Sequence, residues 1–333
     1  MRILTEKTKG GNVMIMKPRT IPRRILQNEA LLRRLPEFHR KRHEIEKDNR
    51  NRISGYKGER QLDYFLGFLP NEFKVYNDLR FKNHTAFQID TLLITPFFTA
   101  IIEVKNYTGT LYFEPLSDQV IQKHAEKELV IPNPISQVKR QAAQFIDWMQ
   151  NEKLPVVPIE HFVVMANPLT YIKTEKENRD ILNTVIHAEK IIDRLLEAKN
   201  HYQKQLLYPH QIKEINKKLL LKHTPSNKKI LEIYGIAEKE LIRGVQCNSC
   251  NSFNIIRRNR KWHCSIFQNI SNTAHRQAIY DYFLLINDQI SNTDCREFLN
   301  IKSRHMTYKF LSSMNLKNKG VTKSRVYIEN NPE

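Results

Sequence analysis

The amino-acid sequence predicts an α/β fold with a mixed central sheet flanked by helices. Two apolar stretches of strand type, residues 89–94 and 99–104, lie on either side of a connection that contains Pro96. Further core elements are expected as strands at 73–79, 110–113 and 161–166 and as helices at 59–68, 135–149 and 188–198. Strands interleaved with helices are typical of a sheet that carries helices on its faces.

Helix boundaries follow from proline and glycine positions. Residues 1–22 are expected to be irregular, and a basic helix or helix pair interrupted at Pro36 should follow up to about residue 51. Gly55 and Gly58 should separate it from the helix at 59–68. The helix at 135–149 begins next to a proline and should bury Val138, Ala142, Phe145 and Ile146.

Length and charge indicate a globular protein with a polyanionic partner. The chain has 333 residues, 40% of them hydrophobic, and a net charge of +19. Residues 1–56 carry fifteen Lys or Arg against six Asp or Glu, and residues 302–325 carry seven basic residues and no acid. Both regions are expected to contact the phosphates of DNA. A membrane surface as partner, or solvated charge without a partner, is the alternative explanation of this basic composition.

Cysteine usage and hydropathy favour the cytoplasm. The longest apolar run, residues 92–104, is too short to cross a bilayer, and the first residues lack the apolar segment of a signal peptide. Only four cysteines occur, three of them between Cys247 and Cys264, which favours a reducing compartment and a metal site over a disulfide framework. No membrane association is expected, and no feature indicates the oligomeric state.

Polar residues occupy set places in the two central strands. Because side chains alternate between the faces of a strand, Gln88 and Asp90 share one side of the first strand, and Glu103 and Lys105 share one side of the second. Charged groups are costly in apolar strands unless they are paired or bind a metal. The pattern therefore indicates either a structural ion-pair cluster or a metal site.

Metal-dependent phosphodiester cleavage needs carboxylates to hold Mg²⁺ and a cation to steady or deprotonate the attacking water. Asp90 and Glu103 would hold the metal, and Lys105 would orient the water and stabilise charge on the phosphate. Glu59 would complete the site directly or through water, although the helix dipole alone also favours an acid in a first turn. Gln88 would hold the scissile phosphate or a metal-bound water.

Several short motifs resemble those of the nuclease-related domain, NERD, a branch of the PD-(D/E)xK nuclease superfamily. They are Gly58-Glu59, Gln88-Ile89-Asp90, the stretch IEVKNYTG at residues 102–109, Asn133-Pro134 and Gln137. The resemblance covers roughly residues 54–166 and implies a restriction-endonuclease-like core that acts on DNA with Mg²⁺ or Mn²⁺. Ile89 replaces the superfamily's proline, and Phe98-Thr99 stand where a glycine is common, but neither change removes a metal ligand. Near the start of the following helix, Gln137 and Arg140 are expected to contact DNA.

A small cysteine module follows. Cys247 and Cys250, then Trp262 and Cys264, resemble a zinc ribbon, in which two hairpin knuckles each present two ligands. Phe267 stands where the second cysteine of the later knuckle would be. His263 or His275 would have to be the fourth zinc ligand, and a metal-free relic of the ribbon is the alternative.

The last segment resembles a winged helix-turn-helix domain. Helices at 275–286, 291–301 and 303–314 and a basic hairpin at 317–328 are expected, the third helix for the major groove and the hairpin for the DNA backbone. A helical tail that packs on the main domain is the alternative. The residues expected to contact DNA are Arg304, His305, Tyr308 and Lys309 in the helix and Lys317, Lys319 and Lys323 in the hairpin.

These segments divide the chain into five expected parts. They are a basic helical extension at 1–53, a nuclease-like domain at 54–200, a helical linker at 201–243, a ribbon-like module at 244–270 and a winged-helix-like domain at 271–333. The leading hypothesis is a Mg²⁺-dependent DNA endonuclease or DNA-processing protein. The two alternatives are a catalytically silent DNA-binding protein that uses the nuclease-like core as a scaffold, and a structural protein in which the charged residues form ion pairs.

Overall fold

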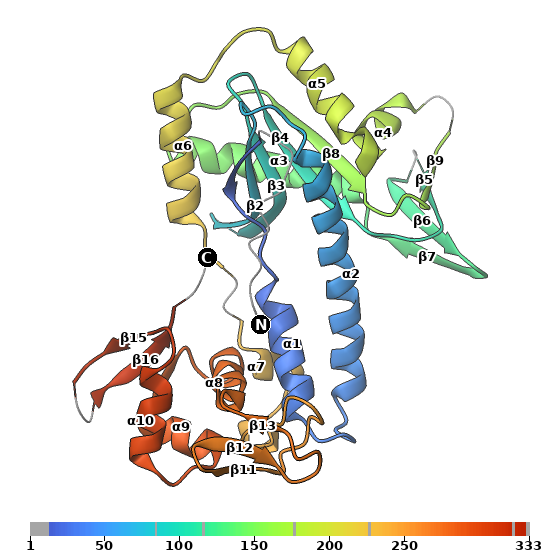
Figure 1. The fold of residues 1–333 in the computed structure, drawn as a ribbon. Coiled ribbons are helices and arrows are strands. Elements are labelled where there is room, and N and C mark those ends of the chain that lie inside the picture. Colours follow the sequence, from blue (N-terminus) through green and yellow to red (C-terminus); the bar gives the residue numbers. More distant parts are fainter. Residues whose placement is uncertain are drawn as a thin grey trace. The chain divides into compact units, whose positions relative to one another are not determined.

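The computed structural model describes residues 13–83, 85–114, 117–175, 178–225, 228–321 and 324–330 (Figure 1). The chain forms two compact units. The first consists of residues 1–19 and 54–226, and the second of residues 20–53 and 227–333. Each unit is therefore built from two separate stretches of sequence.

A six-stranded mixed sheet forms the centre of the first unit, as the sequence predicts (Figure 1). Its strands, in spatial order, are β1 (Met14–Lys17), β2 (Lys74–Lys82), β3 (Ala86–Ile94), β4 (Thr99–Lys105), β8 (Ile159–Met165) and β10 (Val185–His187). The β2–β3 and β3–β4 pairs are antiparallel, and the other three pairs are parallel. The predicted mixed α/β architecture is confirmed.

Helices supply the apolar contacts of both sheet faces. Helix α3 (Pro134–Asn151) and helix α6 (Pro209–Lys222) join one buried cluster with the sheet. The C-terminal half of α2 (Arg42–Leu66) and helix α5 (Ile191–His201) join a second. In α3 the predicted residues Val138, Ala142 and Phe145 are buried, whereas Ile146 is only partly buried. Shorter helical elements are α4 (Arg179–Thr184) and the 3₁₀ turn Ala188–Lys190.

Three local predictions for the first unit are wrong. Helix α2 runs without a break through Gly55 and Gly58, because packing of its buried face outweighs the weak helix preference of glycine. Residues 14–17, expected to be irregular, form the edge strand β1, which pairs with a strand far away in sequence. The connection before Pro134 contains a hairpin, and the resulting small sheet comprises β7 (Lys127–Ile131), β6 (Gln119–His124), β5 (Thr110–Glu114) and β9 (Tyr171–Lys173).

A buried ion pair holds the second unit together. The guanidinium of Arg34, in α1 (Arg23–Arg34), donates to Asp281 of α8 (Ala274–Leu285) at 2.9 Å, and both side chains are about 1% exposed. Arg33 donates to the same carboxylate. A buried charge without a partner is costly, so this contact fixes α1 against α8. The short helix α7 (Ile230–Tyr234) packs in the same cluster as α1.

The remaining elements of the second unit form two small sheets. One contains β11 (Ile255–Arg258), β12 (Lys261–Cys264) and β13 (Ile270–Ser271). The other has the spatial order β14 (Gln289–Ser291), β16 (Val326–Glu329), β15 (Leu316–Lys319). Helices α9 (Asn292–Leu299) and α10 (Arg304–Ser312) lie between β14 and β15 in the sequence. The 3₁₀ turn Glu238–Glu240 precedes both sheets. The three helices and hairpin predicted after residue 275 are present, and β14 is an additional strand.

The division into five parts differs from these two units. The predicted extension at 1–53 contributes β1 to the first unit and α1 to the second. The predicted linker at 201–243 contributes α6 to the first and α7 to the second, because the apolar faces of both helices are buried in separate cores. No helix within the described ranges is long and apolar enough to cross a membrane.

Candidate functional site

Asp90 lies where two central strands stop pairing. The antiparallel register of β3 and β4 runs from Ile94 and Thr99 to Thr91 and Ile102 and goes no further. At this point a side-chain hydrogen bond replaces the backbone pairing of the two strands, because the Oδ2 atom of Asp90 accepts a hydrogen bond from the backbone N–H of Val104 at 3.1 Å. Its Oδ1 accepts no hydrogen bond from the described residues. The end of the ladder therefore presents one open carboxylate oxygen.

Glu103 is fixed by a network of charged and amide groups. The Lys105 ammonium donates to its Oε1 at 2.6 Å, so the predicted meeting of these two side chains is confirmed. From α3, Gln137 donates to Oε1 and Gln141 to Oε2, both at 2.7 Å. Lys105 also donates to the side-chain amide oxygen Oε1 of Gln137 at 3.0 Å. Gln137 thus lies in the carboxylate site, and its predicted contact with DNA remains a prediction.

Gln141 was not anticipated from the sequence. It lies four residues after Gln137, and residues at this spacing share one face of a helix. This spacing from Gln137 is the sequence feature from which the position of Gln141 in the site could have been predicted. Its side chain is buried and supplies the only hydrogen bond that Oε2 of Glu103 accepts from the described residues.

Glu59 reaches the site from helix α2. A Cβ atom added at Gly58 would lie 2.9 Å from the Cβ of Asn106 and 3.1 Å from that of Ala166, which follow β4 and β8. Only glycine allows α2 this close approach to the ends of the two strands. Gly58 therefore sets the position of Glu59, which explains why the two residues form one motif.

Arg19 is the partner of Glu59, and no sequence pattern indicated it. Its Nη1 donates to Oε2 of Glu59 and lies 3.4 Å from the backbone oxygen of Asp90. Its side chain is only 3% exposed and also pairs with Asp63 at 3.0 Å. Arg19 comes from the segment expected to be irregular, directly after β1, so nothing local indicated that it would be buried.

Gln88 and Asp78 form a separate contact at the edge of this site. Gln88 is exposed, and its amide donates to Oδ1 of Asp78 at 2.8 Å. Asp78 has a φ of 52°, a left-handed conformation that is rare in the middle of a strand. The structure shows no hydrogen bond from the Gln88 side chain to Asp90, Glu103 or Glu59 within the described residues. The role predicted for Gln88 in holding a phosphate or a water remains a prediction.

Burial and mutual repulsion shape the charges of the carboxylates. Burial raises the pKa of Asp90 well above its usual range, and the neighbouring charges of Glu103 and Glu59 raise it further. Burial also raises the pKa of Glu59, and the opposing effect of Arg19 does not cancel this rise. Burial lowers the pKa of Lys105, but the charge and hydrogen bond of Glu103 together with the charges of Tyr107 and Asp90 outweigh burial, so the pKa is raised and the ammonium form is favoured.

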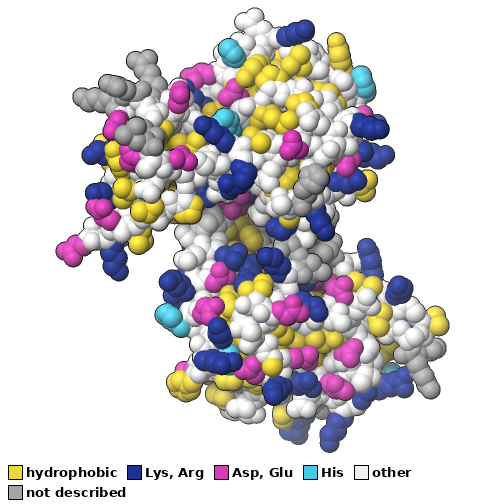
Figure 2. Space-filling view, turned by 180° about the vertical axis from the view of Figure 1, so that it is seen from behind, with side chains coloured by type: hydrophobic (Ala, Val, Ile, Leu, Met, Phe, Trp, Pro, Cys, Tyr) yellow, Lys and Arg dark blue, Asp and Glu magenta, His cyan; other side chains and the backbone are white. Residues whose placement is uncertain are grey.

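The candidate DNA-contacting residues of the second unit are exposed. In α10 the residues Thr307, Phe310 and Leu311 are buried, which leaves the opposite face to solvent. His305, Tyr308 and Lys309 lie on the exposed side of the helix, and Arg304 is exposed as its first residue. The exposed Lys317 and Lys319 lie in β15. Lys323 lies outside the described residues, and Arg140 of α3 in the first unit is also exposed. Lys and Arg side chains are spread over the surface and interspersed with acidic ones on the face that Figure 2 shows.

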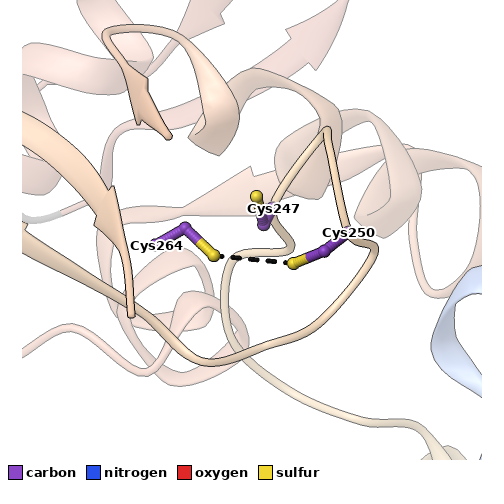
Figure 3. Close-up of side chains that lie close together, drawn as sticks. All are labelled: Cys247, Cys250 and Cys264. Carbon is purple, nitrogen blue, oxygen red and sulfur yellow. Dashed lines mark hydrogen bonds between the residues drawn. The ribbon is translucent and has the colours of Figure 1, made fainter. Parts of the chain in front are cut away.

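Three cysteines converge in the second unit (Figure 3). The sulfur atoms of Cys247, Cys250 and Cys264 all lie within 4.8 Å of one another. The backbone N–H of Phe267 donates to Sγ of Cys264 and lowers the pKa of this thiol to about 7. The later knuckle thus retains a hydrogen bond that favours a thiolate, although Phe267 replaces its second cysteine.

Neither histidine considered as the fourth ligand joins the cysteines. His263 precedes Cys264 in β12, so its side chain points to the opposite face of the strand, and its Nε2 lies 3.0 Å from the backbone oxygen of Arg258. The Nδ1 of His275 accepts a hydrogen bond from the Trp262 indole, and burial lowers the pKa of His275 to about 4. Within the described residues, the metal-ligand group therefore contains three cysteines and no histidine.

Residues 54–166 match the family model described as the nuclease-related domain. The chain therefore carries a nuclease-related domain, which confirms the resemblance seen in its motifs and connects the protein with nuclease-related function and with nucleic acid. The matched residues include Glu59, Asp90, Glu103 and Lys105, whereas Arg19 precedes them. No curated protein and no solved structure matches the chain.

The donor set fits a hard divalent cation. Such ions prefer carboxylate oxygens, and Glu59 and Asp90 each have one oxygen that accepts no hydrogen bond from the described residues. The raised pKa of Asp90 reflects burial first and then repulsion by Glu103 and Glu59, and a bound cation would favour the charged form against both effects. Glu59, Asp90 and Glu103 are therefore the residues that would hold Mg²⁺ or Mn²⁺.

We predict that Gly58→Ala and Gly55→Ala have opposite effects on stability. The new methyl group at residue 58 would be forced against Asn106 and Ala166, so we expect a loss of about 1–3 kcal/mol in the free energy of unfolding. At residue 55 nothing lies within 4 Å, and alanine should stabilise the helix by about 0.5–1 kcal/mol. Denaturant unfolding followed by circular dichroism measures both. Equal effects of the two substitutions would contradict the proposed role of Gly58.

Proposed function

We propose that this protein is a Mg²⁺- or Mn²⁺-dependent enzyme that hydrolyses phosphodiester bonds of DNA. The observation that carries the proposal is the convergence of Asp90, Glu103 and Lys105 at the end of the β3–β4 ladder, with Glu59 added from α2, inside a nuclease-related domain. Four free cysteines support action in the reducing cytoplasm. The DNA preference rests on the superfamily resemblance and on the net charge of +19.

Each residue of the site has a distinct task in this proposal. A bound divalent cation would polarise the scissile phosphate and make a water molecule more acidic. Lys105 uses two of its three N–H donors on Glu103 and Gln137, which leaves one for a phosphate oxygen or the attacking water. Because its raised pKa favours the ammonium form, Lys105 acts as a positive charge on the transition state and not as the base.

The amides of α3 prepare Glu103 for its task. Gln137 and Gln141 hold one oxygen each, so the plane of the carboxylate is fixed before any ligand arrives. Carboxylate oxygens have further lone pairs and remain able to bind a cation. This arrangement reduces the reorganisation that binding would otherwise require.

We predict that Lys105→Ala reduces Mg²⁺-dependent cleavage of plasmid DNA by about 100-fold or more, since one preorganised charge on a transition state contributes on that scale. The exposed Lys213 of α6 offers a matched control. Lys213→Ala removes the same charge from the same unit and should cut like the parent protein. Gel assays with supercoiled and linear DNA, with and without Mg²⁺, measure the rates. If Lys105→Ala cuts as fast as the parent, the assigned site is wrong.

A second candidate function is DNA binding without cleavage. It is favoured by the second unit, in which the order helix, strand, two helices and two strands at residues 274–329 resembles that of a winged helix-turn-helix. In this proposal the exposed face of α10 reads the major groove and the β15–β16 hairpin contacts the backbone. Binding would then survive Asp90→Ala, and no divalent cation would support cleavage.

Lys317 and Lys319 provide a quantitative test of this binding mode. They lie two residues apart in β15 and therefore share one face of the strand. If both contact phosphates, changing both to Gln should reduce the slope of log K against log salt by about 1.8, since each contact contributes about 0.9. Fluorescence anisotropy across a salt series measures the slope. Lys228→Gln with Lys239→Gln, two exposed lysines of the same unit that lie outside both basic regions, should leave it unchanged, and an equal loss there would argue against the hairpin as the contact.

We further propose that the three-cysteine group binds Zn²⁺ as a structural centre with its fourth position filled by a ligand other than His263. The three sulfur atoms and the lowered pKa of Cys264 support thiolate coordination. Co²⁺ should give sulfur-to-metal absorption bands that Cys250→Ser weakens strongly. Cys295 is fully buried in α9 outside this group, so Cys295→Ala should keep the bands. Unchanged bands in Cys250→Ser would refute the site.

A further inference from the structure

Arg19 is the most completely bonded side chain near the carboxylates. Its Nε contacts both oxygens of Asp63, at 3.0 and 3.2 Å. Its Nη2 donates to Asn77 at 3.1 Å and to the Thr91 hydroxyl at 2.8 Å. Its Nη1 donates to Glu59. The guanidinium is thus locked in one place by α2, β2 and β3.

The charge of Arg19 is as firmly fixed as its position. Its guanidinium forms ion pairs with the carboxylates of both Glu59 and Asp63. An arginine does not lose its proton in proteins. The carboxylate site therefore contains a permanent positive charge that no change of pH in the physiological range removes.

This fixed charge alters what the site can bind. When they are ionised around a bound cation, Glu59, Asp90 and Glu103 contribute three negative charges, and Lys105, which pairs with Glu103, offsets one of them. A site that holds two divalent cations needs carboxylate oxygens shared between the ions and enough negative charge to balance both. Arg19 occupies Oε2 of Glu59 and supplies positive charge at the same carboxylate.

We propose that Arg19 is a positioning residue that restricts the carboxylate site to one divalent cation. It forms a hydrogen bond with Oε2 of Glu59, which leaves Oε1 as the open oxygen of that residue. Its positive charge replaces the charge that a second metal ion would supply. The inference rests on the proposed metal dependence and extends it to the number of ions. It also adds to the site a residue that lies outside the matched residues 54–166.

A purely structural clamp would behave differently. If Arg19 only tied α2 to the sheet, its removal would loosen Glu59 and weaken metal binding. If Arg19 acts as the fixed cation, its removal frees a carboxylate oxygen and adds one negative charge to the site, so a second ion should bind. The two roles predict changes of opposite sign.

We predict that replacing Arg19 by a neutral residue raises the number of bound Mn²⁺ ions from one to two per chain. Arg19→Gln removes the charge and keeps a polar amide at this position, and Arg19→Gln combined with Asp63→Asn also removes the carboxylate left without a partner. Arg19→Lys retains the charge and should bind one ion. Isothermal titration calorimetry with Mn²⁺ in the absence of DNA, together with electron paramagnetic resonance of free Mn²⁺, measures the number. The same measurements on Asp90→Ala identify the ions of this site, because the ions that are lost in this variant are those that depend on Asp90.

The outcomes separate this inference from the function on which it rests. If the parent protein binds no Mn²⁺ that depends on Asp90, the proposed function fails and the inference fails with it. If the parent binds one ion and a neutral variant with the parent's circular dichroism spectrum binds one or none, only the inference is overturned. A second ion on Arg19→Lys would also overturn it, because charge would then not determine the number.

Discussion

Mutual repulsion among Glu59, Asp90 and Glu103 is the constraint that the first unit is built to satisfy. Three carboxylates so close that they raise the pKa of Asp90 cannot be left unsupported in a mostly apolar core. Each has a different type of partner. Glu59 has a guanidinium, Asp90 a backbone N–H, and Glu103 an ammonium with two amides. The fold brings these partners from segments far apart in sequence.

Much of the local architecture follows from that requirement. The β3–β4 ladder has to end at Thr91 and Ile102 so that the N–H of Val104 is free for Asp90. Helix α3 has to present Gln137 and Gln141 on one face, with its apolar face packed in the core. The apolar clusters on both sides of the sheet provide the stability that offsets the burial of charge.

The parts that could be predicted from the sequence are those set by local periodicity. Apolar runs identified β3 and β4, and the alternation of side chains placed Glu103 beside Lys105. The continuity of α2 could not be predicted, because it depends on contacts that outweigh the preference of two glycines. Strand β1 and Arg19 were missed for a related reason, since both are defined by partners from about forty to more than seventy residues away. His263 was misplaced as a ligand because its neighbour Cys264 points inward, and adjacent strand residues cannot both do so.

The edge strand β1 makes the first unit discontinuous in sequence. Residues 20–53 are inserted between β1 and the remainder of the unit, which resumes at residue 54. A fragment that starts at the beginning of the matched family segment would expose the backbone edge of β2 to solvent, and an uncovered edge invites pairing with other chains. Such a fragment would also leave Asp63 and Glu59 without the guanidinium that pairs with both. The smallest piece of this chain that retains the partner strand of β2 and the guanidinium partner of Glu59 and Asp63 is therefore larger than its recognisable domain.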